Sequence, residues 1–288
     1  MSDMLTHIRA LRFCVSKNMK KLDILEVEDV KPAESLRVEF FPDRRLKGIL
    51  VRDVENTPEN LGKISGEIQS VSDLVIMRPL SPTKNVTDVL YYIECKEEGC
   101  EEVIASRIEK LGISKEVIIL DLPDERFALS VFFPILTLGE RSIVFRESLC
   151  RGLINGLRER MGEAAAKAFL HIMGMNIGRD LAESLKNALG DKSLKECLKI
   201  LVSIAGAQGF FLPEKIEVKP GSIIIDIREN WEAVCLDEKY RNRGPQCFWT
   251  KGALKGILQL THATWDVEEV KCLANRDPAC RLIASKFE

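Results

Sequence analysis

Between positions 47 and 122, the spacing of the apolar residues changes repeatedly between one typical of strands and one typical of helices. Stretches in which every second residue is apolar indicate strands, and two stretches with apolar residues three or four apart indicate helices. Thr57 is a suitable N-cap for the first helix, Pro58 suits its first position, and Gly112 ends the second helix. The predicted strands cover 48–54, 73–80, 86–95 and 115–122, and the predicted helices cover 56–71 and 97–112.

This order of strand, helix, strand, strand, helix, strand is that of the ferredoxin-like fold. The stretch VRDVENTPENLGKIS also resembles the first strand, loop and helix of an ACT domain, a regulatory module that often binds amino acids. ACT domains commonly carry an aspartate and a glycine in that loop, where this chain has Glu55 and Asn56, and Gly62 comes later. We therefore expect an ACT-like, ferredoxin-like domain over residues 47–122, with a weakened case for amino-acid binding.

Residues 123–288 predict a second domain of the α+β class. Two apolar strands flank the LGER sequence at 138–141, a largely helical block follows from about 146 to 209, and a pair of strands covers 214–234. Within the helical block, Gly174 and Gly178 lie on one helix face. Because a glycine in a helix interior costs about 1 kcal/mol, two on one face predict the close approach of another element.

Residues 1–46 contain two further predicted strands, at 22–30 and 36–41, on either side of the turn-like sequence KPAES. These strands either extend the sheet of the next domain or pack against the C-terminal half. The sequence pattern is compatible with both placements. Cys14 has no cysteine at a ligand-like spacing, so we interpret it as a buried apolar residue.

Three of the nine cysteines surround an acidic pair near the C-terminus. Cys247 opens a helix with apolar residues at helical spacing, 265–273 predicts a strand, and the sequence NRDP predicts a tight turn. A hairpin of this kind brings Cys272 and Cys280 face to face and within reach of Cys247. Three thiols and one carboxylate that converge in this way match a closed, four-ligand Zn²⁺ site.

Strand alternation leaves the identity of the carboxylate open. Glu269 and Cys272 are three residues apart and would point to opposite faces of a regular strand, whereas Glu268 would share a face with Cys272. A β-bulge between Glu269 and Cys272 would remove the conflict, as would a strand that ends before Cys272. The third solution is that Glu268 is the ligand.

The segment EVKCLANRDPAC, about twenty residues after a cysteine that opens a glycine-containing helix, resembles the signature of the 4-vinyl reductase or hydrocarbon-binding domain. GMNIG at 174–178 resembles the small-residue helix motif of the same family, and the resemblance covers about 127–288. The family includes zinc-containing sensor domains of bacterial phenol-responsive regulators. It shares its fold with TRAPP vesicle-tethering subunits and nitric-oxide-signalling ligand-binding domains. Carried over position by position, the resemblance implies that the metal ligands are Cys247, Glu269, Cys272 and Cys280. Glu268 is the alternative to Glu269.

Three thiolates and a carboxylate carry four negative charges against the two positive charges of the ion. We expect neighbouring basic residues to offset the excess. These residues are Lys251, Lys271, Arg276 and Arg281.

The resemblance also implies a site for a small apolar or aromatic molecule. In the phenol-sensing relatives, a tryptophan and a histidine hold the ligand hydroxyl above the sheet. Trp231 lies near the tryptophan position, at a different spacing, and His171 on the GMNIG helix is the nearest histidine. Phe169 beside it and Phe210 after the next helix are further candidates to line the site, although each of these residues also has an interpretation as ordinary core. Domains of this family commonly pair as homodimers.

Composition narrows the classes of function. The 288 residues carry a formal net charge of −2, which gives no basic footprint for direct nucleic-acid binding. No apolar run is long enough for a membrane span, and no signal peptide is apparent. An odd number of scattered cysteines favours a reducing cytoplasm over a disulfide framework. Cys95 and Cys100 form a C-x4-C pair that could chelate a metal, but no second pair accompanies them, so we interpret them as incidental cysteines in a solvated acidic turn.

The two resemblances imply a regulatory sensor protein with an ACT-like module and a C-terminal domain stabilised by structural zinc. No catalytic residue is predicted, because the sequence contains no Gly-rich dinucleotide loop, GxSxG, HExxH or P-loop. Two alternatives remain. The family's association with vinyl-group reduction suggests a subunit of a reductase that acts on a hydrophobic substrate. The tethering relatives suggest an assembly or scaffold subunit.

Overall fold

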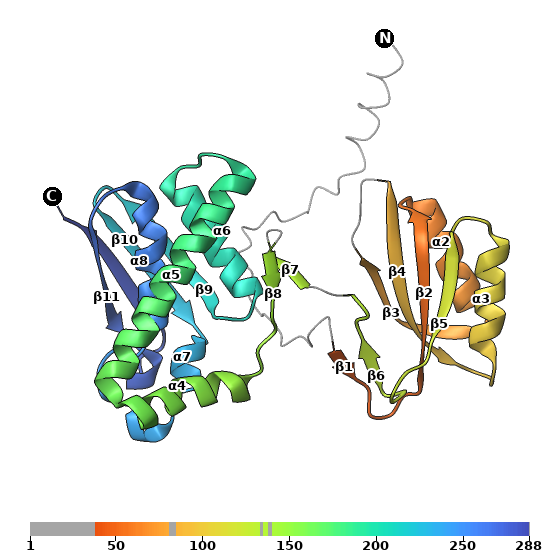
Figure 1. Cartoon of the computed structure of the whole chain (residues 1–288), viewed down its shortest axis with the longest axis horizontal. Coiled ribbons are helices and arrows are strands. Elements are labelled where there is room, and N and C mark those ends of the chain that lie inside the picture. Colours follow the sequence, from red (N-terminus) through yellow and green to blue (C-terminus); the bar gives the residue numbers. More distant parts are fainter. Residues whose placement is uncertain (1–37, 81–84, 133–134, 138–139, 288) are drawn as a thin grey trace, which may run out of the picture. The chain divides into compact units, whose positions relative to one another are not determined.

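The computed structural model describes residues 38–80, 85–132, 135–137 and 140–287, so the predicted strand at 22–30 and Cys14 lie outside the described residues. The described residues fall into two compact units, one up to Ile135 and one from Leu136 onward (Figure 1). Both units mix helices with antiparallel sheets, which confirms the predicted α+β class. None of the described helices combines the length and apolar character needed to cross a membrane.

The N-terminal unit has the predicted order of elements around one four-stranded sheet, β3-β4-β2-β5. Helices α2 and α3 lie on one face of this sheet (Figure 1). The Thr57 side chain accepts a hydrogen bond from the Asn60 N–H and caps α2, and Gly112 adopts a φ of +64° just after α3. The elements are β2 (Leu46–Glu55), α2 (Pro58–Gln69), β3 (Ser72–Leu80), β4 (Val86–Cys95), α3 (Cys100–Lys110) and β5 (Glu116–Leu120).

A small ribbon covers the second face of this sheet. Strand β1 (Val38–Phe40) pairs with β6 (Phe127–Leu129), and Ala128 of the ribbon packs against a cluster that includes Leu50 and Tyr92. The Tyr92 hydroxyl accepts a hydrogen bond from the Leu129 N–H at 2.9 Å and donates one to the Leu129 carbonyl. The predicted strand at 36–41 therefore belongs to the N-terminal unit, a placement that the sequence left open.

The interpretation of Cys95 and Cys100 as incidental cysteines in a solvated turn is wrong, because the two form a disulfide bond. Cys95 ends β4 and Cys100 begins α3, and the turn between them brings their Cα atoms to 5.7 Å. Gly99 makes this turn possible with a φ of +77°, a conformation that costs glycine little. Cys100 is also buried rather than solvated.

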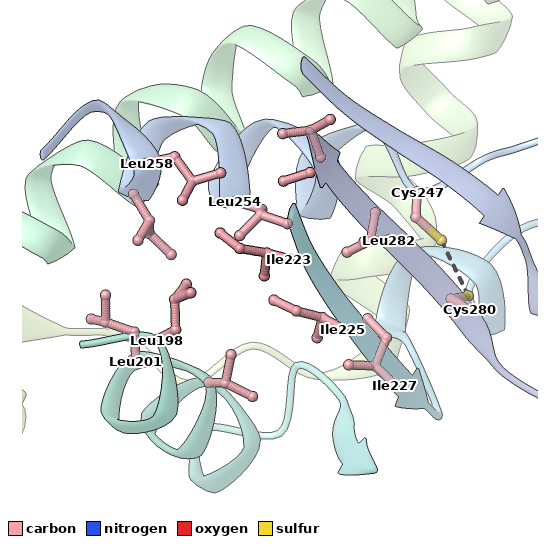
Figure 2. Close-up of a cluster of buried hydrophobic side chains, with 14 of the residues drawn as sticks. Leu198, Leu201, Ile223, Ile225, Ile227, Cys247, Leu254, Leu258, Cys280 and Leu282 are labelled. Atoms are coloured by element: carbon pink, nitrogen blue, oxygen red, sulfur yellow. Dashed lines mark hydrogen bonds between the residues drawn. The ribbon is translucent and has the colours of Figure 1, made fainter. Parts of the chain in front are cut away.

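The C-terminal unit places its helices against the sheet β11-β12-β10-β9. Figure 2 shows the core between them, in which Ile223, Ile225 and Ile227 of β10 face leucines from α6, α8 and β12. The helices are α4 (Glu147–Met161), α5 (Glu163–Leu189), α6 (Leu194–Ala207), α7 (Trp231–Val234) and α8 (Phe248–Leu258), with short 3-10 turns η2 (Glu238–Tyr240), η3 (Gln259–Thr261) and η4 (Leu273–Asn275). The strands are β9 (Leu212–Lys219), β10 (Ser222–Arg228), β11 (Trp265–Lys271) and β12 (Cys280–Lys286).

The two strands expected around LGER are present as the short strands β7 (Ile135–Thr137) and β8 (Glu140–Ser142), which pair with each other. Ile143, Val144 and Phe145 follow β8 outside any strand and are exposed. Apolar alternation over so short a run did not distinguish a strand from an extended segment.

Helices α5 and α8 touch through their backbones. A Cβ atom on Gly174 or Gly178 of α5 would lie 2.0 to 2.1 Å from a backbone oxygen of α8. Gly252 and Gly256 of α8 have the same four-residue spacing, and a Cβ on either would meet a backbone oxygen of α5 at the same distances. The close approach predicted from Gly174 and Gly178 is therefore confirmed, and it fixes α8 on α5 with little room for adjustment.

Candidate metal centre

Cys247 lies at the N-cap position of α8, and its side chain makes no capping hydrogen bond. The first N–H groups of a helix have no partner within the helix. Here the Glu232 carboxylate of α7 accepts hydrogen bonds from the Trp249 and Thr250 N–H groups, each at 2.8 Å. Burial raises the pKa of Glu232 to about 7, and the hydrogen bonds from Thr250 and Trp249 oppose that rise. Because Glu232 caps the helix, the Cys247 thiol is free to face other groups.

The turn between β11 and β12 positions Cys272 and Cys280. The Asp277 carboxylate accepts a hydrogen bond from the Cys272 N–H at 2.8 Å, and Arg276 takes a left-handed conformation with a φ of +67°. The Leu273 N–H donates to the Cys280 sulfur at 3.3 Å. The predicted turn chemistry of NRDP is thus present, and it folds Cys272 back toward the start of β12.

A β-bulge brings Glu269 to the same side as the cysteines. Glu269 pairs with Leu282 and Lys271 with Arg281, so Val270 is an extra residue in β11. Cys272 in addition lies just beyond the end of the strand. As a result Glu269 is buried, whereas Glu268 is exposed.

The four predicted metal ligands meet at one place. Cys247, Glu269, Cys272 and Cys280 are all buried, and one ligand atom from each lies within 4.8 Å of the others. The Cys247 sulfur is 3.8 Å from that of Cys272 and 3.6 Å from that of Cys280, and Figure 2 shows the Cys247 and Cys280 side chains pointing toward each other. Disulfide-bonded sulfurs lie about 2.05 Å apart. Sulfurs at two corners of a tetrahedron with Zn–S bonds of about 2.3 Å lie about 3.8 Å apart.

Glu269 has one carboxylate oxygen without a hydrogen-bond partner among the described residues. Its Oε2 accepts a hydrogen bond from the Cys247 N–H at 2.9 Å, which orients the carboxylate. Its Oε1 is buried without a hydrogen-bond partner. A buried carboxylate oxygen left unpaired is costly, and a cation among the three sulfurs would remove that cost. The donor set and its spacing therefore fit a divalent metal ion.

Without an ion, the surroundings of the cluster oppose ionisation of Cys247 and Glu269 and favour ionisation of Cys272. Burial raises the pKa of the Cys247 thiol well above its ordinary value, and the neighbouring thiols add to the rise. Burial raises the pKa of Glu269 to about 8, with a further contribution from the charge of Cys272. Groups that resist ionisation on their own lose their protons when a metal binds.

The four basic residues expected to offset the charge lie around the cluster rather than within it. Arg281 pairs with Asp226 through two contacts of 2.6 and 2.7 Å, and Lys271 and Arg276 are exposed. Lys251 lines a hollow of about 270 Å³ that reaches the cluster. The hollow is lined by Pro245, Cys247, Phe248, Lys251, Glu268 and Glu269.

Phe210 and Trp231 pack together with Trp249, a residue that the sequence did not single out. Ring centroids are 5.0 Å apart for Phe210 and Trp249 and 5.4 Å apart for Trp231 and Trp249. The Trp231 indole N–H is buried without a hydrogen-bond partner. Trp249 lies two residues after Cys247, so its place in the first turn of α8 was the signal that could have revealed it.

His171 and Phe169 lie on α5 in different surroundings. Burial lowers the pKa of His171, the Phe248 carbonyl opposes that shift, and its Nδ1 is buried without a partner. Phe169 is 43% exposed. Two hollows among the described residues lie beside the cysteine cluster and beside Asp53 of the N-terminal unit, and neither is lined by any of the four predicted ligand-binding residues.

The sequence matches no protein-family model and no curated protein. Three solved structures are similar to about half of this chain. The phenol-responsive sensory domain of the transcription activator PoxR, solved with phenol, is 18% identical over 51% of this chain and 77% of its own, with a TM-score of 0.46. A trafficking protein particle complex subunit 3 from Naegleria fowleri, covalently bound to palmitic acid, is 16% identical over 49% and 95% (TM-score 0.39). An H-NOX protein from S. oneidensis in its Fe(II)NO state is 14% identical over 52% and 80% (TM-score 0.38).

Proposed function

We propose that this chain is a regulatory protein whose C-terminal unit is a small-molecule sensor domain built around a structural zinc ion. The observation that carries the proposal is the meeting of four buried ligand atoms, three sulfurs and one carboxylate oxygen, within 4.8 Å. Cys247, Glu269, Cys272 and Cys280 would fill all four positions of a tetrahedral ion, which is the arrangement of structural rather than catalytic zinc.

In this proposal the ion supplies positive charge and four directed bonds, and the protein uses them to hold three segments together. Cys247 belongs to α8, Glu269 to β11 and Cys280 to β12. The hairpin is thereby tied to the helix that packs on α5. The proposal places the chain in a reducing cytoplasm, where the cluster thiols stay available for a metal, although Cys95 and Cys100 of the N-terminal unit are joined by a disulfide bond.

The sensed molecule would be small and apolar or aromatic, and it would bind beside Phe210 and Trp231. The buried, unpartnered Trp231 N–H supports this assignment, because it offers a hydrogen bond to a hydroxyl or carbonyl group. His171 and Phe169 of α5 complete the proposed set of ligand-binding residues. The ferredoxin-like N-terminal unit would act as the ACT-like regulatory module.

Native mass spectrometry of the full chain tests the metal assignment together with a matched pair of variants. We expect one zinc per chain in the wild type and in Glu268→Gln, whose carboxylate is exposed. Glu269→Gln should bind zinc about 10- to 100-fold more weakly in competition with a chromophoric chelator, because it lacks the charged ligand. Equal affinity of the two variants, or a wild type purified without metal from zinc-supplied cells, would reject the site.

Binding of 2-naphthol, a fluorescent aromatic alcohol, tests the ligand assignment. Trp231→Ala should keep the zinc and weaken 2-naphthol binding at least tenfold, since it removes both the aromatic surface and the N–H donor. If wild type and variant bind the probe equally, Trp231 does not belong to the ligand site.

A second function, as an assembly subunit, is favoured by one surface. Ile172 and Ile177 of α5 are 54% and 43% exposed, and exposed apolar residues on a helix are a feature of contact sites. We propose that the surface of α5 around these two isoleucines pairs two copies of the chain as a homodimer. Light scattering after gel filtration should give a dimer for the wild type and a monomer for Ile172→Glu.

A further inference from the structure

Arg158 of α4 is a buried cation that forms no ion pair with any described carboxylate. It is 3% exposed. Its Nη1 donates to the Ile154 carbonyl at 2.9 Å and its Nη2 to the Gln246 side-chain oxygen at 3.4 Å, while its Nε is buried without a partner. A guanidinium in such a position carries a large desolvation cost. The Tyr240 ring, whose centroid lies 5.7 Å from the guanidinium carbon, offsets part of that cost, and a negative charge close by would offset more of it.

Gln246 links Arg158 to the proposed metal ligands. Gln246 is fully buried and directly precedes Cys247 in the chain. Its side-chain amide donates to the Arg243 carbonyl at 3.4 Å and to the Gly244 carbonyl at 3.2 Å. The guanidinium therefore holds the residue that shapes the loop leading into Cys247.

With a divalent metal ion bound, the site would still carry an excess of negative charge. Three thiolates and one carboxylate exceed the charge of a divalent ion by two, and Arg281 is already paired with Asp226. Burial lowers the pKa of Arg158, and the charges of Glu232, Glu163, Tyr240 and Cys247, in decreasing order of effect, oppose that shift. Glu232 already accepts three hydrogen bonds at the start of α8, and Glu163 pairs with Lys167 and Arg243. The Cys247 sulfur, by contrast, accepts no N–H hydrogen bond from the described residues and lies 3.8 and 3.6 Å from the sulfurs of Cys272 and Cys280.

We propose that Arg158 is a positioning residue for the metal centre. Its guanidinium holds Gln246, and thus the backbone that carries Cys247, and its buried positive charge offsets part of the excess negative charge of the loaded site. The inference rests on the proposed zinc site and deepens it.

The test compares zinc affinity in full-length variants by competition with a chromophoric chelator. Arg158→Met removes the charge and the donors and should weaken zinc binding about 10- to 100-fold, as loss of a residue behind a metal ligand typically does. Arg158→Lys keeps the charge and should stay within a few-fold of the wild type. Arg160→Met, which replaces an exposed neighbour on α4, should match the wild type.

The spectrum of the cobalt-substituted protein separates a charge effect from a general loss of packing. Removal of a cation near a thiolate raises the energy of the sulfur electrons, so the sulfur-to-cobalt charge-transfer band of Arg158→Met should move to longer wavelength, and that of Arg158→Lys should not. Should Arg158→Met not fold, Arg158→Gln, which keeps a donor to Gln246 without the charge, replaces it.

Two failures are distinguishable. A wild type without zinc overturns the metal site itself. A wild type that holds zinc, with Arg158→Met equal in affinity and spectrum, overturns the role of Arg158 alone.

Discussion

The cysteines of the two units meet in opposite ways. In the N-terminal unit, Cys95 and Cys100 are five residues apart and are joined by a covalent bond. In the C-terminal unit, Cys247 is 25 residues from Cys272 and 33 from Cys280, and its sulfur lies 3.8 and 3.6 Å from theirs without bonding. One turn suffices for the first arrangement, whereas the second depends on the packing of a helix, a bulged strand and a turn.

The disulfide and the cysteine cluster depend on different structural features. The disulfide requires the left-handed Gly99 and the start of α3. The cluster requires the glycine contact of α8 with α5, the extra residue Val270 in β11 and the Asp277 hydrogen bond in the turn. A change far from the sulfurs should therefore disrupt the cluster and leave the disulfide intact.

The largest expected effect comes from Cys272→Ser. Binding of structural zinc contributes on the order of 10 kcal/mol to folding, which is comparable with the whole stability of a domain, about 5 to 15 kcal/mol. The variant should lose its zinc, and its C-terminal unit should be unfolded at 25 °C. Elemental analysis and hydrogen exchange measured by peptide mass spectrometry check both outcomes.

Cys197→Ser is the matched control for Cys272→Ser, because Cys197 is a free cysteine on α6 outside the cluster. It should keep the wild-type zinc content. Full zinc in Cys272→Ser would instead show that the three sulfurs do not act together.

Gly174→Ala should have the next largest effect on stability. It should destabilise the C-terminal unit with its cysteine cluster and leave the disulfide of the N-terminal unit unchanged. Its Cβ would lie 2.0 Å from the Trp249 carbonyl oxygen, so the helices must separate. Overpacking of this kind costs about 3 kcal/mol. Denaturant unfolding should show the loss, and zinc should be released at lower denaturant than in the wild type.

Gly152→Ala on α4 gives the opposite expectation, since a Cβ atom at this position would have no other group within 4 Å. Replacement of a helical glycine by alanine there should be neutral or stabilising by up to about 1 kcal/mol. Equal stability of the two alanine variants would contradict the backbone contact of α5 with α8.

Cys95→Ser should destabilise the N-terminal unit and leave zinc binding unchanged, which is the opposite of what is expected for Cys272→Ser and Gly174→Ala. Closing a loop of about five residues stabilises a fold by about 2 kcal/mol. Wild-type protein reduced with a phosphine should unfold at the same denaturant concentration as Cys95→Ser. A stability unchanged by both treatments would mean that the disulfide does not form in solution.

The smallest effect is expected from Asp226→Asn, next to Cys280 on the neighbouring strand. The hydrogen bonds from Arg281 hold the pKa of Asp226 below its usual value, so the pair stabilises the fold above about pH 4 and is lost as the pH falls through the lowered pKa. The variant should be less stable by about 1 kcal/mol at pH 7.

Urea midpoints of wild type and Asp226→Asn between pH 3 and pH 7 check this sign. The gap should close as the solution is acidified, whereas Glu268→Gln, with an exposed carboxylate, should show little gap at any pH. A gap that widened toward pH 3 would contradict the assignment.

Local patterns predicted much of this molecule. Helix and strand periodicity indicated the order of the N-terminal unit, and Gly174 with Gly178 predicted the contact of α5. Cys247, Cys272 and Cys280 were recognisable because turn residues and a helix start lie at fixed positions beside them. For Glu269, alternation alone allowed three solutions, and the structure contains both the bulge and the early end of the strand.

The features that were missed depend on contacts between distant residues or on one local conformation. The pairing of β1 with β6 joins segments about 90 residues apart, and Arg158 meets Gln246 across 88 residues. The disulfide was missed for a different reason: an odd cysteine count argues against a disulfide framework, but it does not exclude a single bond. Gly99 beside Cys100 permits the turn that such a bond needs.

The ribbon of β1 and β6 has a consequence for how the N-terminal unit can associate with other proteins. Helices occupy one side of its four-stranded sheet, and the ribbon with Ala128 occupies the apolar side that contains Leu50 and Tyr92. The sheet still ends in β3 on one margin and β5 on the other. A partner that recruits this unit would therefore have to add a strand at a margin, or dock on helices, rather than stack on the sheet.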